Sequence, residues 1–341
     1  MTNRMIGFFP WARTFDSHRR KATGPCALFF VVLFLWGAAP HSSSAQDRDG
    51  DHVVCFVSIL PEAFFVSRIG GEYVDVHVMV GPGQSPHTYE PTSRQLSDLS
   101  GSQVYFSIGV AFEASLLPRI ERNFKGVRIV DASRGIALRR MLDHEEESAG
   151  SRATTSSNRA ESESHSHDTA GLDPHVWLSP RLGVAIAANM RDALVSMDAA
   201  HAEVYTENFN RLRTELTNID TQIAQILSPY KGREFFVFHP AYGYFADAYG
   251  LIQVAIEAQG GAPGPRHLAE LIDHAKAQRS TTIFVQPQIS ATYAETVAKA
   301  IGARVVSLDP LALNYTENLL EMAHRLAQAY EESGTRRGGN R

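Results

Sequence analysis

The chain has 341 residues, more than one hydrophobic core usually organises, so we expect two compact lobes. Its hydrophobic content of 44% and charged content of 20% are ordinary for a globular protein and exclude a fibrous or wholly disordered chain. The formal net charge of −5 argues against nucleic acid as a partner, because an acidic surface repels phosphate.

Residues 1–45 are predicted to be a cleaved signal peptide. Three basic residues precede an apolar run from Ala27 to Ala39, and small residues lead up to a cleavage site near Ala45. The run has 13 residues, whereas a bilayer span needs roughly 20. An uncleaved anchor is the alternative, because the polar stretch before the run is long for a signal. Cleavage would remove five bases and one acid, leaving an exported, soluble protein with a net charge of −9.

Runs rich in β-branched and aromatic residues predict two sets of strands. The first set is Val53–Leu60, Val74–Val80, Gln103–Ile108 and Val127–Val130. The second set is Phe235–Phe238, Leu251–Ile256, Thr282–Val285 and Arg304–Leu308. Helical spacing occurs between them at Thr92–Leu99, Phe112–Arg122, His267–Gln278 and Thr292–Ile301. Such alternation predicts an α/β fold with two lobes, each a mainly parallel sheet flanked by helices.

A different helical region joins the two sets. Apolar residues from Tyr205 to Ile226 recur at alternating gaps of three and four, which predicts one helix over His201–Leu227. At 1.5 Å per residue this helix would be roughly 40 Å long. Another helix, Pro180–Met197, precedes it. A coiled-coil dimer is the alternative for so regular a stripe, but packing within a monomer is favoured.

These elements divide the chain into four parts after the signal peptide. We expect an N-terminal lobe at 46–178, connecting helices at 179–228, a C-terminal lobe at 229–335 and a tail at 336–341. Within the first lobe, residues 143–169 are rich in Ser, Glu and His and poor in apolar residues, which predicts a mobile loop. The single cysteine after the signal peptide, Cys55, lies in a strand-like run and is expected to be a small buried apolar residue rather than a metal ligand.

Three histidines stand out because each adjoins a proline. His87 follows the strand Val74–Val80 and a glycine-rich turn, His175 follows the predicted loop, and His239 comes directly after Phe235–Phe238. Asp309 likewise follows a predicted strand and precedes a proline. In open α/β sheets, ligand-binding residues gather beyond the carboxyl ends of the strands. The two lobes would therefore each contribute two of these four side chains to one site.

The residue types favour zinc. Neutral imidazole nitrogen binds Zn²⁺ at about 2.0–2.1 Å, and an oxygen from a carboxylate or from water would complete a tetrahedron. Manganese usually takes more carboxylate ligands. Any one histidine beside a proline is more often a capping or surface residue, so the prediction depends on their shared position. Asp309 is the candidate fourth ligand, although a cap for the following turn explains it equally well.

Several motifs in fixed order resemble the zinc/manganese class of solute-binding proteins of ABC transporters, closest to the periplasmic zinc-uptake branch. They are Gly81–Gly83 followed by Pro86–Pro91, then Asp173–Pro180, Phe238–Phe245, Gly260–Pro263 and Leu308–Leu311. The resemblance covers about Val53 to Tyr330. It implies two lobes joined by one long rigid helix, with a metal held between the lobes by His87, His175 and His239, and with Asp309 or water as the fourth ligand.

The resemblance also implies a function. The protein would capture Zn²⁺ with high affinity in the periplasm and deliver it to the membrane permease of an ABC importer. The predicted loop matches in position the histidine-rich loop of the zinc branch, so that His144, His165 and His167 would capture metal weakly, or the loop is simply a solvated linker. Gln286 departs from the pattern, because relatives often carry Glu there and Gln supplies no negative charge.

Two other functions are weighed against zinc delivery. A manganese-binding or adhesin-like member of the same fold is possible, because ligand type alone does not fix selectivity. A zinc hydrolase would need a general base beside the metal, but no HExxH motif and no recognisable catalytic carboxylate occur in the sequence. The sequence therefore favours a binding protein over an enzyme.

Overall fold

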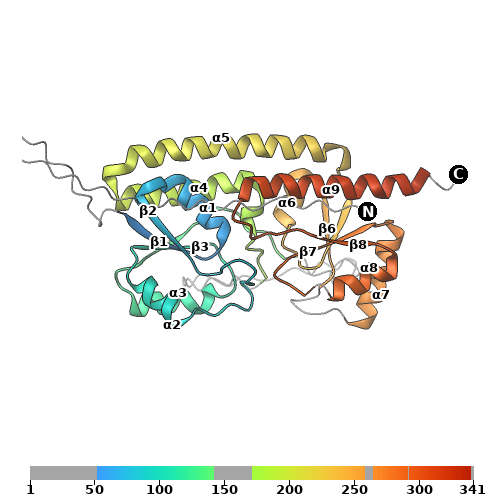
Figure 1. Ribbon diagram of the computed structural model, residues 1–341, viewed down its shortest axis with the longest axis horizontal. Coiled ribbons are helices and arrows are strands. Elements are labelled where there is room, and N and C mark those ends of the chain that lie inside the picture. Colours follow the sequence, from blue (N-terminus) through green and yellow to red (C-terminus); the bar gives the residue numbers. More distant parts are fainter. Residues whose placement is uncertain (1–51, 142–170, 258–263, 291, 339–341) are drawn as a thin grey trace, which may run out of the picture. The chain divides into compact units, whose positions relative to one another are not determined.

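The structure is a computed structural model that describes residues 52–141, 171–257, 264–290 and 292–338. These residues form two four-stranded sheets, each parallel throughout and flanked by helices (Figure 1). The predicted fold class, two α/β lobes, is confirmed. Several predicted features lie outside the described residues: the signal peptide at 1–45, the whole loop 143–169 with His144, His165 and His167, and the motif Gly260–Pro263.

The N-terminal sheet has the strand order β2-β1-β3-β4. Its helix α2 begins where the sequence predicts, because the Thr92 hydroxyl accepts a hydrogen bond from the Gln95 amide and the Gln95 side chain accepts one from the Thr92 amide. The strands of this lobe are β1 (Val53–Val57), β2 (Val74–Val78), β3 (Val104–Ser107) and β4 (Arg128–Asp131), and its helices are α1 (Leu60–Gly70), α2 (Ser93–Ser100) and α3 (Glu113–Asn123).

The C-terminal sheet repeats this order as β6-β5-β7-β8. One face packs Phe236 and Ile283 in a separate core with Leu271 of α7 and Val297 of α8. The opposite face joins the larger core of the molecule. The strands are β5 (Glu234–Val237), β6 (Ile252–Ala255), β7 (Thr282–Val285) and β8 (Arg304–Ser307), and the helices are α6 (Gly243–Tyr249), α7 (Pro265–Ala277) and α8 (Thr292–Ile301).

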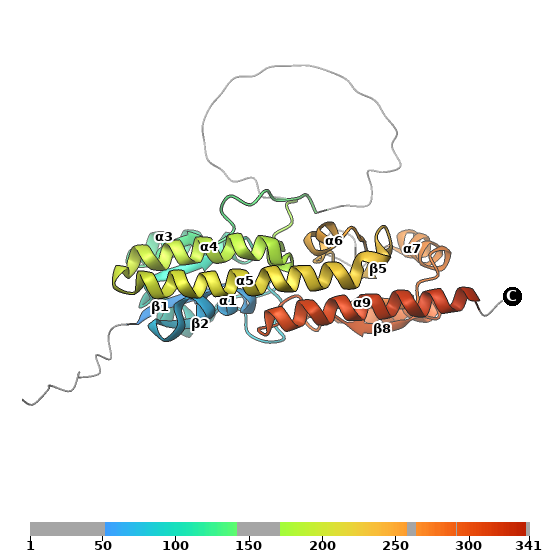
Figure 2. The ribbon, with the colours of Figure 1, turned by 90° about the horizontal axis from the view of Figure 1, so that it is seen from above.

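The two sheets share a layer of three long helices, α4 (Pro180–Met197), α5 (Ala202–Leu227) and α9 (Tyr315–Gly338). Figure 2 shows α5 lying between α4 and α9, and it packs on both. The predicted stripe from Tyr205 to Ile226 lies on the buried side of α5, with Ile219 and Ile226 partly buried and the other members buried. Within the described part of the chain, no helix has the combined length and hydropathy that a membrane span requires.

Helix α9 also bridges the lobes, which the sequence did not reveal. At its start, the Tyr315 ring packs on Phe64 and Phe65 of α1 in the N-terminal lobe. Near its other end, the Ser333 hydroxyl accepts a hydrogen bond of 2.8 Å from Arg233, just before β5. Two helices, α5 and α9, therefore fix the lobes to each other along this layer.

The first predicted strand is too long. Val53–Leu60 was expected to be one strand, but β1 ends at Val57 and α1 begins at Leu60. The cause is Glu62, whose carboxylate accepts hydrogen bonds from the amides of Ser58 and Ile59 and so starts a helix inside an apolar run. Cys55 lies fully buried in β1, and burial raises the pKa of its thiol to about 12, as expected for an inert cysteine.

Candidate metal centre

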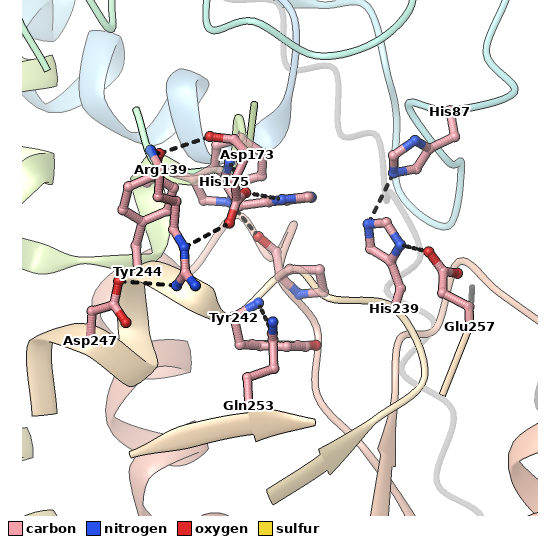
Figure 3. Close-up of polar contacts among 12 residues, drawn as sticks. His87, Arg139, Asp173, His175, His239, Tyr242, Tyr244, Asp247, Gln253 and Glu257 are labelled. Atoms are coloured by element: carbon pink, nitrogen blue, oxygen red, sulfur yellow. Dashed lines mark hydrogen bonds and ion pairs between the residues drawn. The ribbon is translucent and has the colours of Figure 1, made fainter. Parts of the chain in front are cut away.

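His87, His175 and His239, here called the histidine cluster, come together between the two sheets. Each offers one ring nitrogen, and these nitrogens all lie within 4.8 Å of one another. His87 Nε2 and His239 Nε2 are 3.2 Å apart, with the two rings directed toward each other (Figure 3). Two nitrogens bound at about 2.0–2.1 Å to one tetrahedral ion would be about 3.3 Å apart, so this pair already has the required spacing.

The positions of the histidines follow from the topology. His239 lies two residues beyond β5, and His87 lies in the loop that follows β2. His175 precedes a single turn of 3₁₀ helix, Val176–Leu178, that leads into α4. The carboxyl ends of parallel strands meet at one edge of a sheet, and here these edges of both lobes face the same site.

His175 is held by a neighbouring carboxylate. Asp173 Oδ1 is 2.7 Å from His175 Nδ1 and also accepts a hydrogen bond of 3.0 Å from the His175 amide. Both side chains are buried. With Nδ1 occupied as a donor, Nε2 is left with its lone pair free to bind a cation.

His239 has the same arrangement. Its Nδ1 is 2.5 Å from Glu257 Oε1, and Figure 3 shows this contact on a different side of the ring from His87. Sequence reasoning missed Glu257. The signal was present, because Glu257 comes directly after the predicted strand Leu251–Ile256, just as His239 comes directly after Phe235–Phe238.

The surroundings of His87 and His175 favour the neutral form of their imidazoles. Although His87 is the most exposed residue of the cluster, burial of its ring, together with the nearby rings of His239 and His175, lowers its pKa from 6.5 to about 4. Burial also lowers the pKa of His175, and the hydrogen bond to Asp173 opposes this shift in part. At neutral pH both rings are therefore unprotonated, the form that binds metal.

A cavity of about 30 Å³ lies against the cluster. All three histidines line it, as do Trp177 and Gln286. The Trp177 indole donates a hydrogen bond of 2.8 Å to the carbonyl of Pro310, so this ring packs at the wall across the lobe boundary. Organic ligands usually need pockets of about 300 Å³ or more, so this space suits an ion with one or two waters.

Asp309 is not brought into the cluster. Its Oδ1 accepts hydrogen bonds of 2.7 Å from Gln288 Nε2 and 2.9 Å from the Leu311 amide, the pattern of a residue that caps a turn. Gln286 is buried in the wall of the cavity. Among the described residues, the group that could hold a metal ion thus offers three imidazole nitrogens and no carboxylate.

Comparison with known proteins shows the family of the chain. Residues 55–332 match the family model described as "Zinc-uptake complex component A periplasmic". The zinc-binding lipoprotein AdcA of Streptococcus pneumoniae is 28% identical over 291 residues, which is 84% of this chain and 53% of that protein. The high-affinity zinc uptake system protein ZnuA of Bacillus subtilis is 29% identical over 292 residues, covering 83% of this chain and 88% of that protein. The chain therefore spans about half the length of the AdcA relatives.

Solved structures of zinc-binding proteins have the same fold as this chain. A crystal structure of ZnuA superposes with a TM-score of 0.72 at 34% identity, covering 82% of this chain and 99% of that one. A zinc-bound deletion mutant of ZnuA also gives 0.72 and 34%, with 82% and 98% covered. The laminin-binding protein of Streptococcus agalactiae has a TM-score of 0.68 at 23% identity over 82% of this chain and 99% of that one, a likeness of fold alone.

Proposed function

The chain belongs to the family of the periplasmic component A of zinc-uptake complexes, and we propose that it captures Zn²⁺ outside the cytoplasmic membrane and delivers it to an ABC-type importer. The observation that carries the proposal is the meeting of His87, His175 and His239 around a cavity of ionic size. A solute-binding protein of this kind holds its metal as cargo and catalyses no reaction.

Zinc is the metal that these ligands suit best. Three imidazole nitrogens form a borderline-soft set, whereas manganese is usually bound through more oxygen atoms. The carboxylate of Asp173 contacts Nδ1 of His175, and that of Glu257 contacts Nδ1 of His239. Two carboxylates are therefore available to offset the charge of a divalent ion. We propose a water molecule as the fourth ligand, with Asp309 as the alternative if its turn rearranges.

The working form would be a periplasmic monomer from which the signal peptide has been cleaved near Ala45. Its partner would be the membrane permease of the importer, which recognises the metal-bound form. His144, His165 and His167 would act as auxiliary ligands that capture zinc weakly and pass it to the cluster. The signal-like sequence of residues 1–45 supports export, and the histidines of residues 143–169 support the auxiliary role. The family and the zinc-uptake relatives support the importer as partner.

Competition between metals tests the proposal. The mature protein is titrated with Zn²⁺ and Mn²⁺ together, and bound metal is measured after buffer exchange. We expect one tightly bound zinc per chain and no displacement by an equal concentration of Mn²⁺. Displacement at comparable concentrations would make the manganese-binding alternative correct.

An assay for hydrolysis separates binding from catalysis. Zinc-loaded protein is incubated with generic ester and peptide substrates, and product formation is measured. We expect no turnover. Activity that rises with zinc content and disappears in His239→Ala would mean that the centre is an enzyme site.

A further inference from the structure

Arg139 and Asp173 lie on two short segments that pair with each other at the edge of the N-terminal lobe. The Asp173 amide donates a hydrogen bond of 2.9 Å to the carbonyl of Arg139, and the Met141 amide donates one of 2.9 Å to the carbonyl of Gly171. An antiparallel bridge joins Arg140 to Leu172. The backbone that carries Asp173 is therefore fixed to the backbone that carries Arg139.

Helix α6 of the C-terminal lobe holds this pair from the other side (Figure 3). The Tyr244 hydroxyl accepts a hydrogen bond of 2.9 Å from the Arg139 amide and donates one of 2.8 Å to the carbonyl of Asp173. Arg139 Nη1 forms an ion pair of 3.0 Å with Asp247, one turn further along α6. The guanidinium also lies over the Tyr244 ring, 5.8 Å from its centroid.

Gly243, at the start of α6, makes room for the guanidinium. A Cβ atom at this position would lie 2.1 Å from Arg139 Nη1 and 2.5 Å from Arg139 Cζ, which is far inside van der Waals contact. The Arg139 side chain is 19% exposed. The guanidinium of Arg139 thus occupies a space that exists because position 243 carries no side chain.

Arg139 also lies close to the Asp173 carboxylate, which orients His175 of the histidine cluster. Arg139 Nε is 3.8 Å from Asp173 Oδ2, and Asp173 Oδ1 binds both Nδ1 and the amide of His175. The Asp173 carboxylate therefore lies between the guanidinium and the imidazole. Its rotation is restricted from both sides, and the restraining Arg139 is itself held by α6 of the opposite lobe.

We propose that Arg139 is a positioning residue for metal capture, which keeps His175 in its binding orientation by clamping Asp173 to helix α6. The inference rests on the proposed zinc function and extends it. Arg139 itself touches no metal. Its effect passes through Asp173 to the ring of His175, so docking of α6 against the N-terminal lobe and orientation of one ligand are coupled.

Two substitutions test the clamp by different routes. Arg139→Ala removes the guanidinium, and Gly243→Ala displaces it by steric conflict without altering any charged or ligand residue. Alanine is the better helix former, so Gly243→Ala does not weaken α6 itself. Gly126→Ala is the matched control, because a Cβ there would meet no atom within 4 Å.

Zinc dissociation constants are measured by competition with a chelator, and melting temperatures are measured on metal-free protein. Loss of a group that orients a ligand from behind typically weakens metal binding about 10-fold to 100-fold, and we expect about 10-fold for each variant. Gly126→Ala should bind zinc like the wild type. Arg139→Lys should recover part of the lost zinc affinity. Lysine restores a positive charge near Asp247 but not the planar guanidinium that contacts both Asp173 and Asp247.

The double variant gives the sharpest readout. If Gly243→Ala acts by displacing Arg139, it should have no further effect on zinc affinity once Arg139 is already alanine. The clamp is disproved if either single variant binds zinc as the wild type does, or if Gly243→Ala weakens binding equally in both backgrounds. If Arg139→Ala does not fold, the zinc affinity of Gly243→Ala alone tests the proposal. Failure of the wild type to bind zinc would instead overturn the proposed function.

Discussion

At the level of single residues, the candidate site consists of ligands and of the groups that orient them. His175 and His239 each have a carboxylate on Nδ1, whereas His87 has no such partner among the described residues. The two carboxylates fix the tautomer and the ring angle of their histidines. His87 is also the most exposed of the three, so we expect it to be the ligand that moves when zinc enters or leaves.

Glu257→Gln tests the role of the carboxylate behind His239. The amide keeps the size of the side chain but accepts less strongly from Nδ1, so zinc affinity should fall by about 10-fold to 100-fold. Competition with a chelator measures the dissociation constant. Glu295→Gln on α8 is the control, because Glu295 is exposed and far along the chain from the cluster. An unchanged affinity in Glu257→Gln would contradict the role.

Sequence reasoning singled out the candidate ligand histidines but not the groups that support them. His87, His175 and His239 adjoin prolines and lie in motifs of known order, so the sequence alone was enough to single them out. Glu257 follows a predicted strand as His239 does, but the contacts of Glu257 and Asp173 with the rings depend on side-chain geometry, which sequence spacing does not fix. Asp309 illustrates the opposite case, because its position after a strand fits either a ligand or a cap and the structure engages it with Gln288 and Leu311.

At the level of elements, the strands were predictable and the helix starts were less so. Strand positions agree closely because runs such as Thr282–Val285 consist of buried β-branched and aromatic residues. Helix α1 was missed, since it begins within an apolar run and its start depends on the buried carboxylate of Glu62. Periodicity also could not reveal which lobe the start of α9 contacts, because that contact is made by Tyr315 with α1.

A second buried carboxylate joins the ends of β1 and β3. Glu113 accepts hydrogen bonds from Ser58 Oγ and from the amides of Ile108 and Gly109. Burial raises the pKa of Glu113 from 4.5 to about 7, despite these hydrogen bonds. The neighbouring Glu62 is likewise buried, and its pKa also lies well above the ordinary value. The folded protein therefore binds a proton at Glu113 more tightly than the unfolded chain does.

This shift predicts how stability depends on pH. Between pH 4.5 and about 7 the folded state holds more protons at Glu113 than the unfolded state, so its contribution to stability falls as pH rises. Glu113→Gln removes this titration. Relative to the variant, zinc-free wild type should lose on the order of 1 to 3 kcal/mol between pH 5 and pH 8. Urea unfolding measures the difference, with Glu121→Gln on the exposed side of α3 as control. A gap that is the same at both pH values would contradict the prediction.

At the level of the whole molecule, the candidate metal centre depends on the relative position of the two lobes. The lobes share the layer of α4, α5 and α9, and His87 and His239 come from opposite sheets. The sequence indicated the lobes and the long helix, but not the second bridge through α9. Zinc bound between the lobes would add a direct link between them and so stiffen the molecule.

Zinc affinity should decrease as pH falls. Protonated imidazole cannot bind metal, so protons compete with zinc at each ligand. Because burial lowers the pKa of His87 to about 4 and also lowers that of His175, part of the loss should come below the ordinary histidine range. Dissociation constants between pH 8 and pH 4.5 measure the profile. An affinity that is independent of pH would mean that histidines are not the ligands.

Deletion of residues 143–169 should leave the tight site intact. The flanking segments already touch, with the Met141 amide 2.9 Å from the Gly171 carbonyl, so the ends can be joined without moving Asp173. We expect a zinc dissociation constant within about 2-fold of the wild type and loss of any weaker binding. If the deletion abolished the tight site, His144, His165 or His167 would have to be a primary ligand.

The ligand set of bound zinc is the central claim, and X-ray absorption at the zinc edge of the one-to-one complex measures it directly. The account predicts three imidazole nitrogens and one further light atom at about 2.0–2.1 Å, with no sulfur. His239→Ala should lose one imidazole and bind zinc at least about 100-fold more weakly, while the exposed control His324→Ala should match the wild type. A spectrum with fewer than three imidazoles, or one that is unchanged in His239→Ala, would contradict the account.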